Sequence, residues 1–529
     1  MGRVSVKILP FLIFVIFFSC RKDTVTNWDI DFTGPLVTSK LNIKNFLGDT
    51  LFSSSSNNIL NLSYNRQIAH IKLDSLIKLP DTTIINQFLW PSPFPSTLNP
   101  NQSISLLPPT PLAFNISNGV ALKYGIIRKG VLNIKFSNSI TQPLDFKYVL
   151  PGVKKNNVAF TVFETIPPGE NSLIKSYVLD GYDIDLTAGG LASFNTIIQN
   201  YTVSLNSNAQ PAEITFGKGA KAEISYTEII PQYALGYFGQ QNVSLSPDTA
   251  DLDIFQNFNA TNLQLNEATL DFRIINEFGA EFSGSLNNIK SINSIKANTV
   301  ALNSQQLSAI NINRAYQTGG NINPSVKLIS LNKNNSNILP FLSNLPNKIS
   351  YAGNIRINPL GNTLGYQDFA YYNTGIRVMA DIQIPLRFNA TAFYLESKTD
   401  IDFTNLKQLD NVNYGNFIIN ATNGYPFDVQ LQAYLLDAGN TLIDSLFSIN
   451  NNVISKGTID ANNNVTAVNR EKLLIPFDTN KLQNIKKSKS IKIKARLVMP
   501  PNPPEITIKE HYEIDVDIIL DVNYKVRRN

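Results

Sequence analysis

The stretch YEIDVDI, residues 512–518, alternates apolar and acidic side chains at every position. Successive side chains of a β-strand point to opposite faces of a sheet, so this spacing predicts one buried and one exposed face. The same period of two recurs in VLNIKF (131–136) and IKIKARL (491–497). Helical spacing is confined to short segments, at residues 191–199, 249–257 and 304–309. The pattern predicts an all-β protein of several antiparallel β-sandwich-like domains in tandem.

A unit of strand, asparagine turn and strand occurs three times. Its turns are predicted at Asn138, Asn276 and Asn420, which are 138 and 144 residues apart. This spacing is close to the size of one β-domain, and asparagine suits a turn because it tolerates left-handed backbone angles. The unit resembles the hairpin of β-sandwich domains of the late-embryogenesis-abundant type. The resemblance implies duplicated β-sandwiches.

Proline marks the main domain boundary. Seven prolines lie between positions 91 and 111, and proline has no N–H to donate to a sheet or helix. We therefore predict the following division: a signal peptide at 1–19, an N-terminal β segment with a Pro-rich linker at 20–110, and β-sandwich-like domains at 111–250, 251–395 and 396–529.

The first twenty residues have the pattern of an export signal. Arg3 and Lys7 precede an apolar run at residues 8–18, which is too short to span a bilayer comfortably, and Ser19 precedes Cys20, the only cysteine. The constellation resembles a lipoprotein signal of Bacteroidota. It implies that Cys20 becomes an acylated N-terminus, with palmitate among its chains, and anchors the protein to the cell outer membrane. An ordinary secretory signal and an N-terminal membrane anchor are the alternatives.

The face of the membrane is left open. In Bacteroidota, acidic residues after the lipidated cysteine accompany surface display, whereas here Arg21 and Lys22 follow it. Both a periplasmic and a surface location therefore remain compatible with the sequence.

Composition argues against several function classes. The net charge of +5 is small for 529 residues and is spread along the chain, which does not indicate a nucleic-acid partner. Histidine, the side chain that most readily exchanges protons near neutrality, occurs only at His70 and His511. The chain also contains no nucleophile-elbow, zinc-protease or phosphate-loop motif. We predict no catalytic residues and no cofactor.

Pairs of aspartates two residues apart recur along the chain. Two such carboxylates share one side of a strand and could begin a calcium site, but such a site needs more oxygen ligands. We predict solvated strand faces and no metal. The pairs are Asp29/Asp31, Asp183/Asp185, Asp251/Asp253, Asp400/Asp402 and Asp515/Asp517.

Two aromatic clusters are candidate interfaces for a protein or glycan, with core packing as the alternative. Their candidate residues are Tyr233, Tyr237, Phe238, Tyr366, Tyr371 and Tyr372. A basic run at 486–496 could meet anionic lipid or polysaccharide, but on an alternating strand its cations face solvent by default.

Asp-Ser and Asp-Thr followed by a small or aliphatic residue occur six times. These tripeptides resemble the O-glycosylation acceptor of exported Bacteroidota proteins. The resemblance implies glycans at Thr24, Thr50, Ser75, Thr82, Thr249 and Ser445.

Together these features predict a non-enzymatic outer-membrane lipoprotein that acts as a binding or scaffolding component of the cell envelope. An accessory subunit of an outer-membrane protein complex is one form of this role. A carrier that binds lipid or glycan is the first alternative, and a carbohydrate-active enzyme with two carboxylates in one cleft is the second. The chain also resembles a broad set of Bacteroidota cell-envelope lipoproteins, a resemblance that implies no mechanism.

Overall fold

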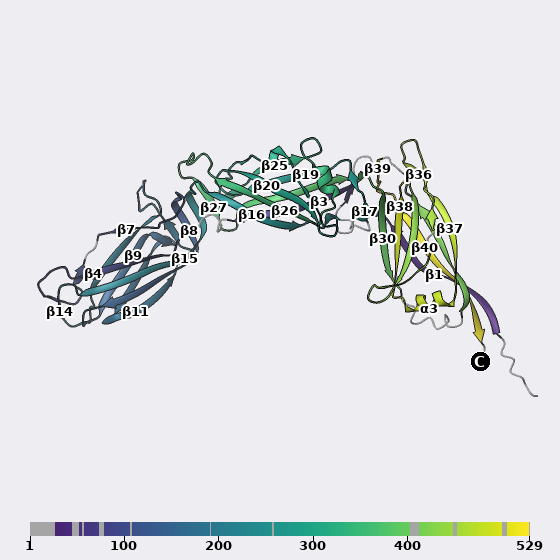
Figure 1. The fold of residues 1–529 in the computed structure, drawn as a ribbon. Coiled ribbons are helices and arrows are strands. Elements are labelled where there is room, and N and C mark those ends of the chain that lie inside the picture. The colour runs from purple at the N-terminus through teal and green to yellow at the C-terminus, as the bar shows by residue number, and fades with distance from the viewer. Residues whose placement is uncertain are drawn as a thin grey trace, which may run out of the picture. The chain divides into compact units, whose positions relative to one another are not determined.

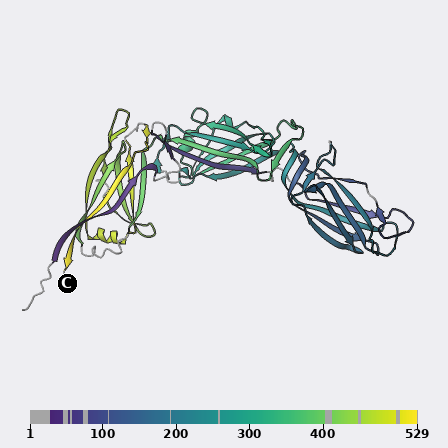
Figure 2. The same cartoon turned by 180° about the vertical axis from the view of Figure 1, so that it is seen from behind.

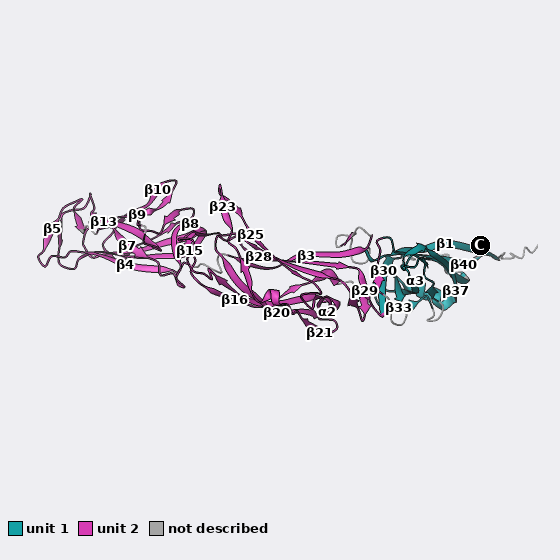
Figure 3. Cartoon of the chain, turned by 90° about the horizontal axis from the view of Figure 1, so that it is seen from above, with its two compact units in different colours: residues 1–46, 392–499, 511–529 teal, residues 47–391, 500–510 magenta. Residues whose placement is uncertain are grey.

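The chain divides into two compact units (Figure 3). Unit 1 comprises residues 1–46, 392–499 and 511–529, and unit 2 comprises residues 47–391 and 500–510. Both are built from antiparallel sheets (Figure 1), which confirms the predicted class of tandem β-sandwiches. The computed structural model describes residues 27–44, 52–54, 58–72, 79–105, 108–190, 192–255, 259–401, 412–447, 452–499 and 505–527.

Unit 1 is a sandwich of two sheets. The first has the order β1 (Asn27–Leu41), β40 (Ile514–Arg527), β31 (Val412–Asn423) and β37 (Asn469–Phe477). The second has the order β30 (Ala392–Asp400), β38 (Ser490–Val498), β32 (Asp428–Leu436) and β33 (Leu442–Ser445), with β34 (Val453–Ile454) beside β32. The alternation in 512–518 has the predicted effect, because Ile514, Val516 and Ile518 are at most 1% exposed.

Shorter elements complete unit 1. Strands β35 (Thr458–Ile459) and β36 (Val465–Ala467) pair with each other. Helix α3 (Thr479–Lys487) is preceded by its N-cap Asp478, whose side chain accepts a hydrogen bond from the Lys481 N–H. None of the helices in the described ranges has the length and apolar character needed to cross a bilayer.

The first described strand belongs to unit 1, beside the last strand of the chain (Figure 2). Strand β1 pairs with β40 from Asn27 opposite Arg527 to Leu41 opposite Ile514, with a bulge between Pro35 and Val37. Among the other described strands of residues 20–110, β2 pairs with β3 inside the segment, whereas β3 to β7 pair with strands from later in the chain. The segment expected at 20–110 therefore contributes to three sandwiches, which local sequence patterns could not reveal because the partners are distant in sequence.

The first part of unit 2 is a second sandwich. One sheet has the order β2 (Phe52–Ser54), β3 (Leu60–Lys72), β28 (Gly375–Pro385), β19 (Thr269–Asn276) and β25 (Ser325–Leu331). The other has the order β16 (Asn242–Asp251), β26 (Lys348–Ile357), β20 (Phe282–Asn293) and β21 (Asn298–Ala301), with β22 (Ile310–Ile312) beside β20. Helix α2 (Ile338–Ser343) packs against β20 and β21. Shorter strands are β17 (Asn259–Thr261), β18 (Gln264–Leu265), β23 (Tyr316–Thr318), β24 (Asn321–Asn323), β29 (Arg387–Asn389) and β39 (Ile506–Thr507).

The second part of unit 2 is a third sandwich-like body, formed by one larger sheet that curves around an aromatic core. Its path is β27 (Asp368–Tyr371), β15 (Gly219–Tyr237), β8 (Ala121–Asn138), β12 (Asp183–Asp185), β9 (Leu144–Lys155), β13 (Thr196–Leu205) and β6 (Ser103–Ser105). Beside this path lie β4 (Thr82–Leu89), β7 (Thr110–Ala113), β10 (Val158–Ile166) and β11 (Gly169–Val178), and β5 (Ser96–Leu98) pairs with β14 (Ala212–Ile214). Phe136, Phe146 and Tyr148 are fully buried.

The helical expectations were largely wrong. Residues 196–199 begin β13, and residues 249–251 end β16. In the described residues of these three segments, the only helical elements are single 3-10 turns, at η3 (Asp253–Phe255) and η4 (Gln305–Leu307). Pairing with neighbouring strands outweighs weak local helical preference at these positions.

The asparagine repeat is real at two of its three predicted positions. Asn138 and Asn276 end β8 and β19 and are at most 2% exposed. Each side-chain oxygen accepts the N–H two residues on, and each amide donates to the carbonyl four residues on (2.8 and 2.9 Å at Asn138; 2.9 and 3.0 Å at Asn276).

The third turn was predicted three residues too early. Asn420 lies exposed within β31, opposite Lys472 and Asp517. Asn423 ends that strand, is fully buried, and makes the same two bonds, to the Tyr425 N–H at 2.9 Å and the Phe427 carbonyl at 2.8 Å. One asparagine corner therefore occurs in each of the three sandwiches.

Candidate functional site

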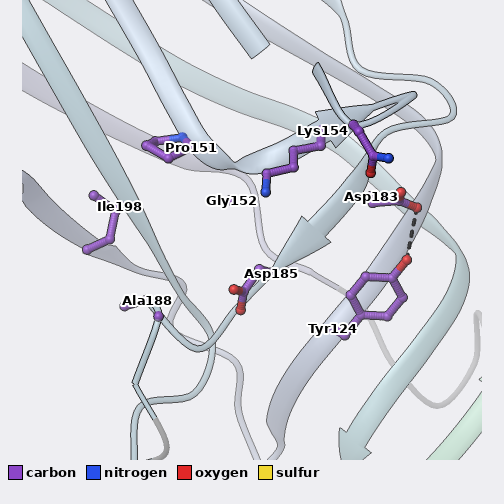
Figure 4. Close-up of a pocket in the computed structure, with 10 residues that line it drawn as sticks. Tyr124, Pro151, Gly152, Lys154, Asp183, Asp185, Ala188 and Ile198 are labelled. Carbon is purple, nitrogen blue, oxygen red and sulfur yellow. Dashed lines mark hydrogen bonds between the residues drawn. The ribbon is translucent and has the colours of Figure 1, made fainter. Parts of the chain in front are cut away.

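A pocket of about 480 Å³ opens on unit 2 beside β12 (Figure 4). Strand β8 supplies an aromatic ring, β9 a cation, β12 two carboxylates and β13 an aliphatic side chain. The lining residues are Tyr124, Pro151, Gly152, Lys154, Asn157, Asp183, Asp185, Ala188, Gly189 and Ile198.

Strand β12 places the two carboxylates. It lies between β8 and β9, with Asp183 opposite both Ile126 and Lys154. Ile184 is 7% exposed and turns toward the core, so Asp183 and Asp185 both turn to the pocket side. The Asp-x-Asp spacing thus puts two acidic groups on one wall.

Hydrogen bonds fix both carboxylates. The Tyr124 hydroxyl donates to Asp183 Oδ1 at 2.9 Å (Figure 4). Asp185 Oδ1 accepts from the backbone N–H and the hydroxyl of Thr187, at 2.9 and 2.6 Å. A carboxylate accepts through both oxygens, so each aspartate keeps acceptor capacity for a ligand.

Tyr124 is a neutral donor at physiological pH. Burial raises the pKa of its phenol to about 12, and the bond to Asp183 acts in the same direction. The ring therefore provides an apolar surface and a fixed hydroxyl, and it does not ionise in the range where proteins usually operate.

The pocket rim requires close approach of two backbones. A Cβ on Gly152 would lie 3.2 Å from the Asp185 carbonyl oxygen, so glycine allows β9 to approach β12. The turn after β12 passes through Ala188 and Gly189, both with positive φ (52° and 73°). Lys154, which is exposed, places its ammonium group at this rim. The pocket thus combines acidic acceptors, one cation and an aromatic wall.

The pocket does not assemble a metal site. No group of three or more His, Cys, Asp or Glu side chains suited to a metal occurs within the described parts of the chain. Three other Asp-x-Asp pairs have polar partners on their own sheets or close by: Asp31 accepts from Asn523, Asp253 pairs with Arg66, and Asp515 pairs with Lys40. Asp402 lies outside the described residues.

The two predicted aromatic clusters come together in unit 2. Tyr233 on β15 is the register partner of Tyr371 on β27, and their ring centroids are 4.7 Å apart. Gln317 donates to the Tyr371 hydroxyl at 2.7 Å, and Tyr124 of the pocket packs edge-on against Tyr233 at 6.2 Å. The aromatic cluster is therefore continuous with the pocket wall.

The other predicted aromatic residues extend this cluster. Tyr366, in a turn with φ of 64°, stacks on Phe194 at 4.2 Å and meets Tyr237 edge-on at 6.3 Å. The Arg128 guanidinium lies 3.7 Å from the centre of the Tyr372 ring, as in a cation–π pair. These rings are partly exposed. They therefore connect neighbouring segments and also offer aromatic surface to solvent or a partner.

Phe238 is core, with 1% of its surface exposed. Its backbone N–H donates to Asp368 Oδ2 at 2.9 Å, and the Asn358 amide donates to the same oxygen at 2.6 Å. Burial raises the pKa of Asp368 despite these two donors. A carboxylate is thus held in a site that favours its neutral form.

This pKa shift sets a pH dependence. The native state holds the Asp368 proton more tightly than the unfolded chain, so its contribution is most stabilising below the unfolded pKa and is lost as pH rises through the folded pKa. Asp368→Asn keeps an acceptor oxygen for both donors and removes the buried charge. We expect the variant to have a higher unfolding free energy than the parent at pH 7, with the difference shrinking in acid.

Urea unfolding of unit 2 at a series of pH values measures this difference. Glu213→Gln, at an exposed position of β14, is the control and should show no such trend. A difference between Asp368→Asn and the parent that stayed constant with pH would contradict the assignment.

The remaining predicted residues are dispersed. Cys20, Thr24, Thr50 and Ser75 lie outside the described residues. Thr249 is exposed on β16, whereas Thr82 and Ser445 are partly buried on β4 and β33.

The basic run lies partly on the central strand β38. Lys492 and Lys494 bracket Glu396 at 3.0 and 3.1 Å. Burial alone would raise the pKa of Glu396, but the two lysines hold it below its usual value. Both cations are therefore engaged on the outer face of their own sheet.

The pocket was only partly visible in the sequence. The Asp183/Asp185 pair was the signal, but its solvated-face interpretation missed the site because Tyr124 and Lys154 come from other strands. Gly152, a glycine inside the strand β9, is the other local sign of close backbone approach.

Comparison with known proteins yields no family. No protein-family model and no curated protein matches the chain. Among solved structures, a secreted-protein candidate from Parabacteroides distasonis is 13% identical, with a TM-score of 0.26, over 53% of this chain and 82% of that one. A structure of the infectious bursal disease virus Gt strain is 9% identical, with a TM-score of 0.13, over 92% of this chain and 87% of that one. Similarities at these TM-scores establish no relationship of function.

Proposed function

We propose that this protein is a non-enzymatic binding component of the outer cell envelope, held to the outer membrane by lipid at Cys20. Its pocket beside β12 binds a glycan. The observation that carries the proposal is the convergence of Tyr124, Lys154, Asp183 and Asp185 on one pocket of about 480 Å³.

The chemistry of the pocket suits a ligand with many hydroxyl groups. Carboxylates held in place accept hydrogen bonds from neighbouring hydroxyls, and the Lys154 ammonium donates to ring or hydroxyl oxygens. The Tyr124 ring offers an apolar surface against which the C–H face of a sugar can lie. A purely apolar lipid would leave these polar groups unpaired, which costs free energy.

A binding role also fits the arrangement of titratable groups. His70 lies on β3 in unit 2 and His511 lies in unit 1. Burial lowers the pKa of His70, so its ring is neutral near pH 7. In the pocket, Asp185 is held by Thr187 and Asp183 by a phenol that stays protonated, an arrangement that binds hydroxyls without supplying an acid–base pair.

The test is glycan binding by the double variant Asp183→Asn, Asp185→Asn. Asparagine preserves the bonds from Tyr124 and Thr187 but removes both charges, so we expect a rise in Kd of about ten-fold or more. Glycan-array screening of the parent identifies the ligand, and calorimetry then measures the variants.

The matched control is Asp251→Asn, Asp253→Asn, an Asp-x-Asp pair of the same unit outside the pocket lining. Its Kd should equal that of the parent. Equal loss in both double variants, or no glycan bound by the parent, would contradict the glycan assignment.

The partly exposed aromatic cluster favours a second candidate function, that of an accessory subunit of an outer-membrane protein complex. Aromatic rings and arginine anchor protein interfaces, and Arg128 with Tyr372 presents both together. Purification from native membranes in mild detergent would recover a stoichiometric protein partner in this case. Recovery of the chain alone would rule out this second candidate.

A further inference from the structure

Strand β1 carries a row of large apolar side chains on one face. Trp28, Ile30 and Phe32 are 61%, 39% and 54% exposed, and we name them the β1 stripe. Three alternating residues of this size on one exposed strand are unusual in a solvated surface.

The stripe continues the core face of its sheet. Phe32 is the register partner of Val522, which is 4% exposed, and Val37 is the partner of Ile518, which is fully buried. Residues opposite each other on antiparallel strands point to the same side. The stripe therefore lies on the side that is core farther along the sandwich, at the end where that core stops.

The other face of β1 is polar. Asp31 accepts a hydrogen bond from the Asn523 amide at 2.8 Å, and Thr33 donates to Asp521 at 2.8 Å. The strand is thus amphipathic, and one orientation puts all three apolar side chains against an apolar medium while keeping Asp29 and Asp31 in water.

The chain before β1 brings the stripe to a membrane, a step that rests on the proposed lipid anchor. Cys20 precedes Asn27 by seven residues, which span at most about 25 Å when fully extended. Acyl chains at Cys20 would therefore hold the stripe at high effective concentration near the lipid surface.

Basic residues lie near the stripe in the sequence and on the strand that pairs with it. Arg21 and Lys22 follow Cys20 in the sequence, and Lys525 and Arg527 belong to β40. Strand pairing places Arg527 opposite Asn27 and Lys525 opposite Asp29. Basic residues beside a membrane anchor are attracted to anionic headgroups.

We propose that the β1 stripe inserts into the headgroup region of an anionic lipid bilayer and so orients unit 1 on the membrane. Tryptophan and phenylalanine partition favourably into this interfacial zone, where an indole N–H still meets polar groups. The lipid at Cys20 supplies attachment, and the stripe supplies orientation.

The test is quenching of Trp28 fluorescence by brominated lipid. Trp90→Phe leaves Trp28 as the single tryptophan of the full lipidated chain. In vesicles containing phosphatidylglycerol with brominated acyl chains, we expect emission at about half or less of that in ordinary vesicles, because insertion brings the indole next to the acyl region.

Two further variants separate stripe insertion from general proximity. Ile30→Ser, Phe32→Ser in the Trp90→Phe background should lose most of the quenching. The control Val326→Ser, Leu328→Ser alters two exposed apolar residues of β25, with 56% and 55% of their surface exposed, and should keep the quenching.

The N-terminal peptide mass distinguishes the possible failures. Acyl groups at Cys20 with unquenched Trp28 would overturn the stripe proposal and leave the anchor intact. Absence of acyl groups would overturn both, because the seven-residue tether to lipid would be lost. Trp28 that is shielded from aqueous acrylamide but unquenched by brominated lipid would assign the stripe to a protein contact and likewise overturn the proposal.

Discussion

Replacing Asn423 with alanine is expected to lower the unfolding free energy of unit 1 by about 3 kcal/mol. The side chain is fully buried, and its amide donates to the carbonyls of Phe427 and Ser455 at 2.8 and 3.1 Å. Its oxygen accepts the Tyr425 N–H at 2.9 Å. Alanine would leave these backbone groups unpaired inside the sandwich, where water cannot replace the lost partner.

Asn420→Ala is the matched control, because Asn420 lies three residues earlier on the same strand and is exposed. It should change stability by no more than about 0.5 kcal/mol. Chemical denaturation followed by hydrogen exchange in β31 and β40 measures both variants. Equal stability of the two variants would show that the hydrogen bonds of Asn423 add nothing to the unfolding free energy of unit 1.

The same device recurs where the sequence repeats. Asn138 donates to the carbonyls of Gln142 and Ile166, and Asn276 donates to those of Ala280 and Asn313. In each sandwich, one asparagine both forms a turn and joins it to a segment distant in sequence. Each corner uses one side-chain acceptor and two donor hydrogens, which asparagine supplies, whereas ionised aspartate has no donor and serine has only one.

Local sequence predicted the strands with clear alternation and the nature of the turns, but not the first residues of β13 or the last residues of β16. Alternation predicted β38 and β40 with the correct buried faces, and two of three corner asparagines were predicted correctly. The third was placed at Asn420 because several asparagines fall within a few residues there, and only burial distinguishes Asn423 from its neighbours.

Topology lay beyond local pattern. The pairing of β1 with β40 joins residues about 500 positions apart, and β3 pairs with β28 about 310 positions away. Partners so far apart leave no sign within a short window of sequence. Such pairing is nevertheless possible because the entropy cost of closing a loop grows only slowly with its length.

For the candidate site too, local sequence predicts one part and tertiary structure supplies the other. That Asp183 and Asp185 share a side follows from the two-residue spacing, as does the paired orientation of Asp515 and Asp517. What separates a binding wall from a solvated strand face is the surroundings: Tyr124 and Lys154 stand beside the first pair, whereas Asp515 pairs with Lys40 on an open sheet face. Those neighbours come from tertiary structure.

Leu41→Asp is expected to unfold unit 1 and to leave unit 2 folded. Leu41 is 2% exposed at the end of β1 and lies opposite the fully buried Ile514. An unpaired carboxylate there costs at least about 4 kcal/mol, a large share of the stability of an ordinary domain. Hydrogen exchange should show loss of amide protection in β31, β38 and β40.

Strands β8 and β15 should keep their protection in the same sample, because their partners all belong to unit 2. Thr38→Lys is the control: it places a charge on the exposed face of β1, opposite Asp517, and should preserve protection in both units. Retained protection of unit 1 in Leu41→Asp would mean that β1 is dispensable to the sandwich. Simultaneous loss in β8 and β15 would mean that the two units fold as one. Selective loss requires that β1, the strand nearest the predicted lipid, completes the core built by residues 392–499 and 511–529.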